Sequence, residues 1–191
     1  MYRIHVWIRH INPMIWRRLV VPAESTLADL HYAIQIAFAW TDYHLHRFRI
    51  RGKEYGIPRL GGPWYSRDAR DIRLIDFHFR VNERFLYEYD FTDGWEHQVR
   101  IEQLVSPEQM QPYSVCVGGS RAAPPEDCGG PTAFQQRRTH SIASKSATPC
   151  RLGNWPRIMV TCRTRKTPGT LLFISSSPSS LDGPTHCTRQ Y

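Results

Sequence analysis

The chain has 191 residues, of which 41% are hydrophobic and 12% aromatic, enough for one folded domain, alone or with a tail. Its formal charge is +8, but residues 1–138 hold 18 basic and 16 acidic residues, whereas residues 139–191 hold 7 and 1. The whole-chain charge therefore does not establish a basic surface on the domain. No apolar run approaches the ~18 residues of a transmembrane span or has the pattern of an export signal, which predicts a cytoplasmic protein without a membrane partner.

Two alternating stretches predict an N-terminal β-hairpin. Apolar and polar residues alternate over residues 2–9, the period expected when successive side chains point to opposite faces of a sheet. After the turn signal Asn12-Pro13, the alternation resumes over residues 15–21 and stops at Pro22. We therefore expect these two strands to pair.

A helix and a third strand should follow. Thr26 and Asp29 resemble a capping box, and apolar residues then recur at helical spacing, which predicts a helix over residues 27–39. The period of two returns over residues 44–51. Residues 56–73 carry turn residues without an apolar period and are predicted to form a mobile excursion.

A second hairpin is predicted from residues 84–91 and 95–104, which alternate on either side of Asp93-Gly94. Residues 111–130 form a loop rich in glycine and proline. The fold expected is α+β, an antiparallel sheet with one main packed helix, in which two hairpins flank a helix–strand unit.

The composition changes after residue 138. Ser, Thr, Pro and Gly account for 24 of the 53 residues from 139 to 191, and Leu, Ile, Val and Phe for only 9. A segment this poor in apolar residues cannot bury a core, so we expect a disordered tail after a domain of residues 1–138. The five cysteines contain no Cys-x-x-Cys pair, which disfavours a zinc ribbon and a disulfide framework.

Several segments, in order along the chain, resemble motifs of the plasmid pRiA4b ORF-3-like family. They read Ile-Trp-Arg-Arg-Leu at 15–19, Leu-His-Tyr-Ala-Ile-Gln at 30–35, His-Leu-His-Arg-Phe at 44–48, Tyr-Glu-Tyr-Asp-Phe-Thr-Asp-Gly-Trp-Glu-His at 87–97, and Pro-Pro-Glu-Asp-Cys-Gly-Gly at 124–130. The resemblance implies an α+β domain of plasmids, other mobile elements and bacterial chromosomes whose biochemical role is not established.

Two positions depart from the family pattern. Thr92 stands where the family usually has glycine, which removes some backbone freedom from the turn. After Gly130 the family usually continues into acidic helical sequence, whereas this chain continues into a tail rich in Ser, Thr and Arg. We therefore expect a frameshift or a fused unrelated end after about residue 131, and a domain that lacks its last helical packing partner.

The motif segments supply the candidate site. The candidate pocket residues are His31, Trp40, Asp93, Trp95, Glu126 and Asp127. His44, His46 and His97 would suit a divalent transition metal, with Glu126 or Asp127 supplying a carboxylate, although no helical zinc spacing is present and no cofactor is established. The favoured alternative is structural: the histidines hydrogen-bond nearby carboxylates, and the acids cap the glycine-rich loop.

A row of basic residues is a candidate surface for binding nucleic acid. Arg47, Arg49, Arg51 and Lys53 share one strand face and could contact phosphates while Trp16 or Tyr43 stacks on bases. The small charge of residues 1–138 favours instead a solvated outer face. Two functions stay open: a binding or interaction module, with nucleic acid as one candidate partner, ahead of a metal-assisted hydrolase with a His/acid cluster.

Overall fold

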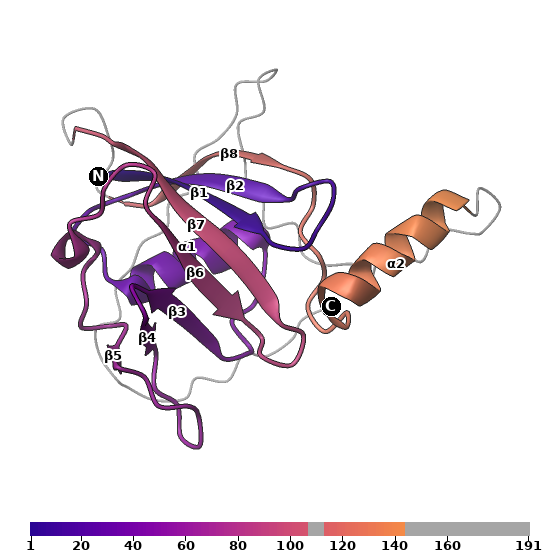
Figure 1. Cartoon of the computed structure of the whole chain (residues 1–191), viewed down its shortest axis with the longest axis horizontal. Helices are drawn as coiled ribbons and strands as arrows, with labels where there is room; N and C mark the ends of the chain where they lie inside the picture. The colour runs from indigo at the N-terminus through magenta and orange to yellow at the C-terminus, as the bar shows by residue number, and fades with distance from the viewer. Residues whose placement is uncertain (107–112, 144–191) are drawn as a thin grey trace, which may run out of the picture.

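A computed structural model describes residues 1–106 and 113–143, and the counts below refer to those residues. They form one eight-stranded sheet in the order β5-β4-β3-β6-β7-β1-β2-β8 (Figure 1). The strands are β1 (Tyr2–Ile8), β2 (Trp16–Val21), β3 (His46–Ile50), β4 (Lys53–Gly56), β5 (Arg67–Asp68), β6 (Arg84–Tyr89), β7 (Trp95–Leu104) and β8 (Val115–Ser120). Neighbouring strands run antiparallel except β4 and β5, which are parallel. The sheet is thus the mainly antiparallel α+β architecture that the sequence predicts.

The main helix, α1 (Leu27–Phe38), begins and ends at identifiable caps. Thr26 Oγ1 accepts a hydrogen bond from the backbone N–H of Asp29, whose carboxylate accepts one from the N–H of Thr26, which confirms the capping box. At the other end Ala39 adopts the left-handed conformation, and Arg17 Nε donates to Ala37 O at 2.7 Å. Arg17 thereby places a positive charge at the negative end of the helix dipole.

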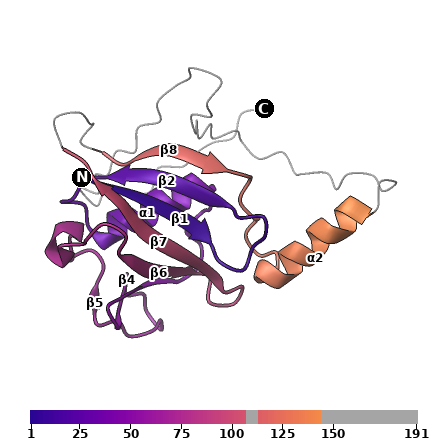
Figure 2. The same ribbon diagram turned by 45° about the horizontal axis from the view of Figure 1, so that its top comes forward.

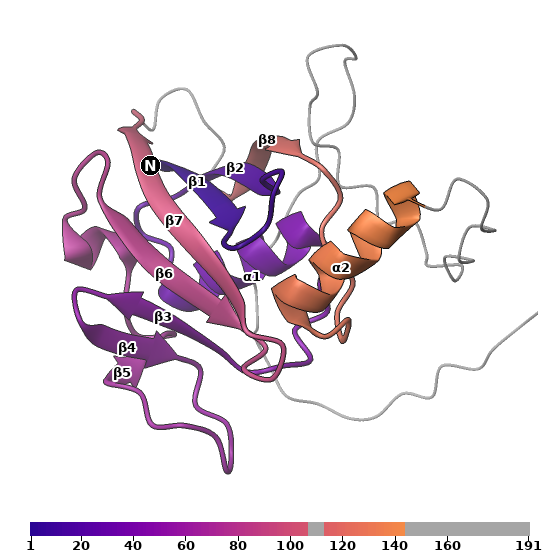
Figure 3. The ribbon, with the colours of Figure 1, turned by 45° about the vertical axis from the view of Figure 1, so that its right-hand side comes forward.

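The sheet has two unlike faces. The inner face is the one that α1 covers, and along each strand the buried side chains point to it. In Figure 3 α1 lies behind the sheet, and none of the described elements lies in front of β6 and β7, so the outer face is open there. Four strands each contribute a residue with no exposed surface to this inner core: Val6, Phe48, Tyr87 and Val99. The other, outer face carries charged side chains, arginines above all, and two tryptophans.

The prediction of a mobile excursion over residues 56–73 is wrong for its second half. Ala69 and Ile72 are buried, and their carbonyl oxygens accept hydrogen bonds from the backbone N–H groups at the start of α1, at 3.0 and 2.9 Å. Strand β5 also extends the sheet from β4. Isolated apolar residues produce no period, so a segment held by such long-range contacts escapes pattern analysis.

Four further elements were not predicted: β4, β8, the short 3-10 helix η1 (Leu74–Phe77) and a second helix, α2 (Gly130–Ala143). Helix α2 begins beside the β6–β7 turn, where Phe134 contacts Trp95, and extends away from the sheet (Figure 2). Helix α2 continues past residue 138, where we expect the domain to end; that boundary stays a prediction. The predicted disordered tail lies outside the described residues from residue 144 onward. Within the described part of the chain no helix is long and apolar enough to cross a membrane.

Candidate functional site

A loop formed by residues 124–130 closes over the end of the sheet where β6 turns into β7. It is anchored by hydrogen bonds to residues from two other segments. These are Trp40 Nε1 to Pro124 O at 2.8 Å, Thr41 N and Oγ1 to Glu126 Oε2 at 3.0 and 2.7 Å, and Gly129 N to Asp93 Oδ2 at 3.0 Å. Two of the candidate pocket acids, Glu126 and Asp93, are therefore engaged in holding the loop.

Gly130 allows this loop to approach the turn of the second hairpin. Its φ is +75°, and a Cβ at this position would lie 2.2 Å from the carbonyl oxygen of Asp93. No L-side chain fits such a contact, so glycine is required for sterics as well as for the backbone conformation. Nearby, Tyr89 donates its hydroxyl hydrogen to Glu126 Oε1, and burial together with this bond raises the pKa of Tyr89.

Two histidines, His31 of α1 and His46 of β3, meet in a buried polar network between the helix and the sheet. His31 bonds through Nδ1 to the Tyr87 hydroxyl and through Nε2 to Asp42 Oδ1, both at 2.8 Å. The ring of His46 stacks on that of His31 with centroids 3.5 Å apart and planes 11° apart. Burial lowers the pKa of His31, and that of His46 to about 2, so both imidazoles are neutral.

This stacking decides against a metal ion between the two histidines. The lone pairs of imidazole nitrogens lie in the ring plane, so two rings stacked face to face direct them along parallel lines. They cannot converge on one ion, although His31, Asp42 and His46 offer ligand atoms within 4.8 Å of one another. The group is better explained as core structure, although the carboxylate bonds His31 and not His46, for which the structural alternative expected such a bond.

The structure does not bring His97 together with His44 and His46 as one metal site. His97 lies on β7 opposite Tyr87, fully buried, with Nδ1 donating to the carbonyl oxygen of Trp95 at 3.1 Å. Its ring contacts those of Phe38 and Trp40, and burial lowers its pKa to about 3. The shared alternation of strands 44–51 and 95–104 placed these histidines on one face but could not give their spacing across it.

His44 instead lies between two carboxylates. Its Nδ1 is 3.7 Å from Asp90 Oδ1, and its Nε2 is 3.0 Å from Asp127 Oδ1. The Asp90 side chain is only 3% exposed, whereas that of Asp127 is 75% exposed. The group therefore has a buried side and a side open to solvent.

The six candidate pocket residues do not line one cavity. The Trp40 ring stacks on that of Tyr89 at 5.1 Å and lies 5.9 Å from that of Trp95, so aromatic side chains fill the space beneath the loop. Trp40, Asp93, Glu126 and Asp127 do gather at the 124–130 loop, while His31 and Trp95 belong to the core.

The predicted phosphate-binding row is largely paired with acids. Arg47 and Arg49 both contact Glu88, at 2.8 and 2.9 Å, and both contact Glu54 at 3.2 Å. Lys53 is exposed at the start of β4. The role of the row as phosphate contacts stays a prediction, but its arginines are neutralised within the sheet.

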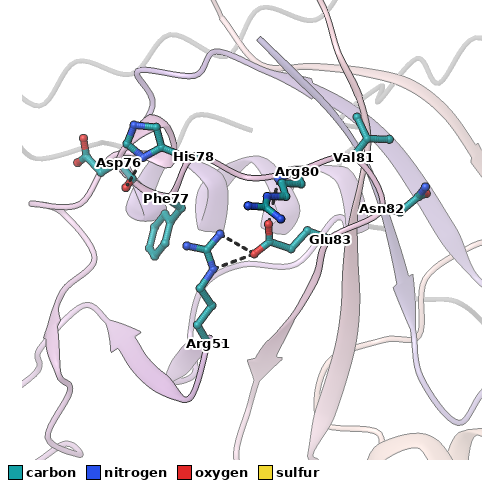
Figure 4. A pocket seen from close by; sticks show the side chains of 8 residues that line it. All are labelled: Arg51, Asp76, Phe77, His78, Arg80, Val81, Asn82 and Glu83. Carbon is teal, nitrogen blue, oxygen red and sulfur yellow. Dashed lines mark hydrogen bonds and ion pairs between the residues drawn. The ribbon is translucent and has the colours of Figure 1, made fainter.

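Arg51 borders a hollow of about 690 Å³ at the opposite end of the sheet from the 124–130 loop, between the β3–β4 turn and the segment before β6 (Figure 4). Figure 4 shows its guanidinium directed at Glu83, at 2.8 Å, and Glu83 also accepts a hydrogen bond from the backbone N–H of Arg80. Arg51 and Glu83 therefore satisfy each other, and Asp76, which also lines the hollow, pairs with Arg73 outside it, so these groups do not converge on a ligand.

A patch that the sequence analysis missed lies on the outer face of β6, β7, β1 and β2. We call it the Trp–Arg patch; its members are Arg3, His5, Trp7, Trp16, Arg18, Arg84, Arg100 and Glu102. Trp7 and Trp16 are directly opposite each other on paired strands. The register of the predicted hairpin would have revealed this pair.

The arginines of the Trp–Arg patch lie over its indole rings and around its one acid. Arg18 is 5.2 Å from the ring centroid of Trp16, and Arg84 is 5.9 Å from that of Trp7. Glu102 accepts hydrogen bonds from Arg18 and Arg100 and lies 3.6 Å from Arg3; the bonds from Arg18 are the main cause of its lowered pKa. Among the described residues, Arg3 Nε, Arg100 Nε and both ring nitrogens of His5 are buried without a hydrogen-bond partner.

Comparisons with known proteins give relatives without a known activity. The model of a family described as "Plasmid pRiA4b ORF-3-like protein" matches residues 1–146. An uncharacterised protein of Sinorhizobium fredii (strain NBRC 101917 / NGR234), y4hQ, is 36% identical over 135 residues, covering 70% of this chain and 69% of its own. The crystal structure of a protein of unknown function from Methanosarcina mazei Go1, MM3350, is similar with a TM-score of 0.65 and 36% identity, covering 78% of this chain and 83% of its own.

Proposed function

We propose that this chain, which belongs to the plasmid pRiA4b ORF-3-like family, binds single-stranded nucleic acid on the outer face of its sheet. The observation that carries the proposal is the composition of the Trp–Arg patch, which holds four arginines and one carboxylate. Three of the guanidinium groups lie around Glu102, and that of Arg84 lies over Trp7. On the neighbouring part of the same face, Arg47 and Arg49 are balanced by Glu54 and Glu88. The unbalanced positive charge of this face is therefore concentrated at the patch, where phosphates would be attracted.

The tryptophans indicate which form of nucleic acid would bind. Trp7 and Trp16 lie side by side on an open sheet face, a surface on which unpaired bases stack, with about 1–3 kcal/mol for each base–aromatic contact. A duplex hides its bases, and its major groove admits a helix or a two-stranded ribbon more readily than a broad sheet. The patch therefore favours single strands over duplexes.

The unpaired donors of the patch support an anionic ligand. Arg3 and Arg100 each have a buried Nε–H that makes no hydrogen bond among the described residues, although that of Arg3 lies 3.6 Å from Glu102 Oε2. A buried donor without an acceptor costs about 1–3 kcal/mol, and phosphate oxygens would supply the missing acceptors. Binding would require these guanidiniums to turn toward solvent, which Arg3, 42% exposed, can do more easily than Arg100, 31% exposed.

The test is binding of a labelled oligonucleotide of about 12 nucleotides, followed by fluorescence anisotropy, with the full chain. Replacing Arg3 and Arg84 by alanine should weaken binding about tenfold at low salt and reduce the slope of log K against log salt by about 1.4. The matched control is the double alanine variant of Arg47 and Arg49, which removes the same charge from the same face but from arginines already paired with glutamates.

Three results would contradict the proposal. The first is unchanged binding by the Arg3/Arg84 variant, which would assign any affinity to residues 139–191 with their excess of basic residues. The second is an equal loss in both double variants, which would show only a general effect of charge. The third is equal affinity for a duplex of the same sequence.

A further inference from the structure

The group formed by His44, Asp90 and Asp127 brings three segments together. His44 precedes β3, Asp90 follows β6, and Asp127 lies in the 124–130 loop, yet each offers a ligand atom within 4.8 Å of those of the other two. Unlike the pair His31 and His46, this group has a single imidazole, so parallel rings do not prevent its atoms from converging. Its open side, at Asp127, is accessible to solvent.

The contact between His44 and Asp127 is close without being a hydrogen bond. Their Nε2 and Oδ1 atoms are 3.0 Å apart, but Nε2 of His44 is buried and has no hydrogen-bond partner among the described residues. The distance is therefore suitable for a hydrogen bond and the direction is not. A donor and an acceptor placed in this way need another explanation for their proximity.

A shared cation supplies that explanation. Two ligand atoms that lie about 2.1 Å from one ion and at right angles to each other are about 3.0 Å apart, as in octahedral coordination. In this arrangement the carboxylate oxygen lies off the lone-pair axis of the ring nitrogen, because the ion itself occupies the axis. The short, misaligned approach of His44 and Asp127 has this pattern.

Asp90 has the position of a residue that orients a metal-binding histidine. A ligating imidazole commonly directs its second ring nitrogen at a carboxylate, which fixes the orientation and tautomer of the ring. Nδ1 of His44 faces Asp90 Oδ1 at 3.7 Å. That oxygen is itself held by the backbone N–H groups of Thr92 and Asp93, at 3.1 and 3.2 Å.

The loop that carries Asp127 is fixed before any ion arrives. Glu126, the preceding residue, is bonded to Thr41 and Tyr89, and Gly129 is bonded to Asp93. Asp127 itself has a φ of +55°, and its Oδ1 lies 3.0 Å from His44 Nε2. A site whose supporting contacts already exist loses little entropy on binding.

We propose that His44 Nε2 and Asp127 bind one divalent cation of the Mn²⁺ type, with Asp90 as the positioning residue and water in the remaining coordination positions. One imidazole with carboxylate and water ligands suits an octahedral ion that prefers nitrogen and oxygen over thiolate. The site lies at the 124–130 loop, apart from the Trp–Arg patch, so the proposal is independent of nucleic-acid binding. A bound ion with open positions is also what the metal-assisted hydrolase, the second function expected from the sequence, would require.

The test is titration of the untagged full chain with MnCl₂, followed by electron paramagnetic resonance, in which the signal of free Mn²⁺ decreases as the ion binds. One Mn²⁺ per chain should bind, and the single variants His44→Gln and Asp127→Asn should each weaken binding at least about tenfold. Because the Asp127 side chain is 75% exposed, its amide variant will fold, as an unchanged thermal unfolding curve would show.

The matched control is His10→Gln. His10 also lies near a carboxylate, with its Nε2 3.6 Å from Glu96 Oε2, but no third ligand joins that pair among the described residues. This variant should bind Mn²⁺ as the unchanged chain does. The proposal is overturned if the unchanged chain binds no Mn²⁺ below millimolar concentration, or if Asp127→Asn and His44→Gln bind as tightly as His10→Gln.

Discussion

On the inner face of the sheet, histidines and tyrosines lie buried against α1 and carry no charge, whereas the outer face holds arginines and glutamates in ion pairs over two tryptophans. His46 and His97 on the inner face have pKa values of about 2 and 3 because burial disfavours the imidazolium ion. On the outer face Glu102 stays ionised, since the bonds from Arg18 lower its pKa. The inner face thus holds little charge beyond that of Arg17 at the end of α1, whereas the outer face concentrates it.

This difference between the two faces indicates which side chains stabilise the fold and which are available to bind a ligand. On the inner face both ring nitrogens of His31 have partners, Tyr87 and Asp42, whereas Nε2 of His46 is buried without a hydrogen bond among the described residues. The outer face is less dependent on such matching, because solvent satisfies exposed groups, and it can present unpaired donors to a ligand. Loss of inner side chains should therefore affect folding, and loss of outer ones should affect binding.

Tryptophans on the two faces provide the largest contrast. Trp95 on the inner face has no exposed surface, so Trp95→Ala should lower the free energy of unfolding by about 3–5 kcal/mol, for the lost transfer energy and the cavity left behind. Trp16 on the outer face is only partly buried, so Trp16→Ala should cost about 1 kcal/mol. Urea unfolding of both variants measures the difference; equal losses would mean that the outer tryptophans are core residues.

Acid should act on the inner face first. Below the ordinary pKa of 6.5 the unfolded chain binds protons at His46 and His97 that the folded chain does not, so stability falls as the pH falls. Between pH 7 and pH 5 each of these histidines should cost about 2 kcal/mol, and the loss should continue toward pH 3.

The variant His46→Phe isolates one histidine in this experiment. Nε2 of His46 has no hydrogen-bond partner among the described residues, so an apolar ring can replace it. The loss of stability between pH 7 and pH 5 should then decrease by about 2 kcal/mol, as urea unfolding at the two pH values would measure. A pH dependence unaffected by His46→Phe would show that His46 is protonated in the folded chain.

The sequence predicts the elements whose patterns are local. Both hairpins, α1 with its capping box and strand β3 follow from periodicity and turn residues, and they agree with the structure to within about two residues. Strands β4, β5 and β8 are short or contain glycines, so they leave no such period. Their places depend on the neighbours with which they pair.

The candidate site was predictable as a set of residues and not as an arrangement. His44 and Asp127 could each be named from the sequence, but their approach depends on the 124–130 loop closing against Asp93 and Thr41, a long-range event. The position of Glu102 likewise depends on an irregularity in the pairing of β1 with β7 next to Arg3, where Tyr2 to Arg3 and Ile4 to Ile8 follow different registers. Neither feature has a periodic signal.

A loss of stability as small as that of Trp16→Ala, and the sharpest test of the outer face, is expected from Glu102→Gln. Glutamine keeps the shape and part of the hydrogen bonding but removes the one carboxylate among four arginines, so unfolding should become easier by only about 1 kcal/mol. The same change raises the positive potential of the Trp–Arg patch, and affinity for single strands should rise, most at low salt.

Glu88→Gln is the matched variant, because Glu88 also pairs with two arginines, Arg47 and Arg49, on the same face. If both variants bind single strands more tightly to the same degree, the nucleic acid also contacts the row of basic residues from Arg47 to Lys53. If only Glu102→Gln does so, the contact is the Trp–Arg patch. If neither does, the outer face does not bind nucleic acid.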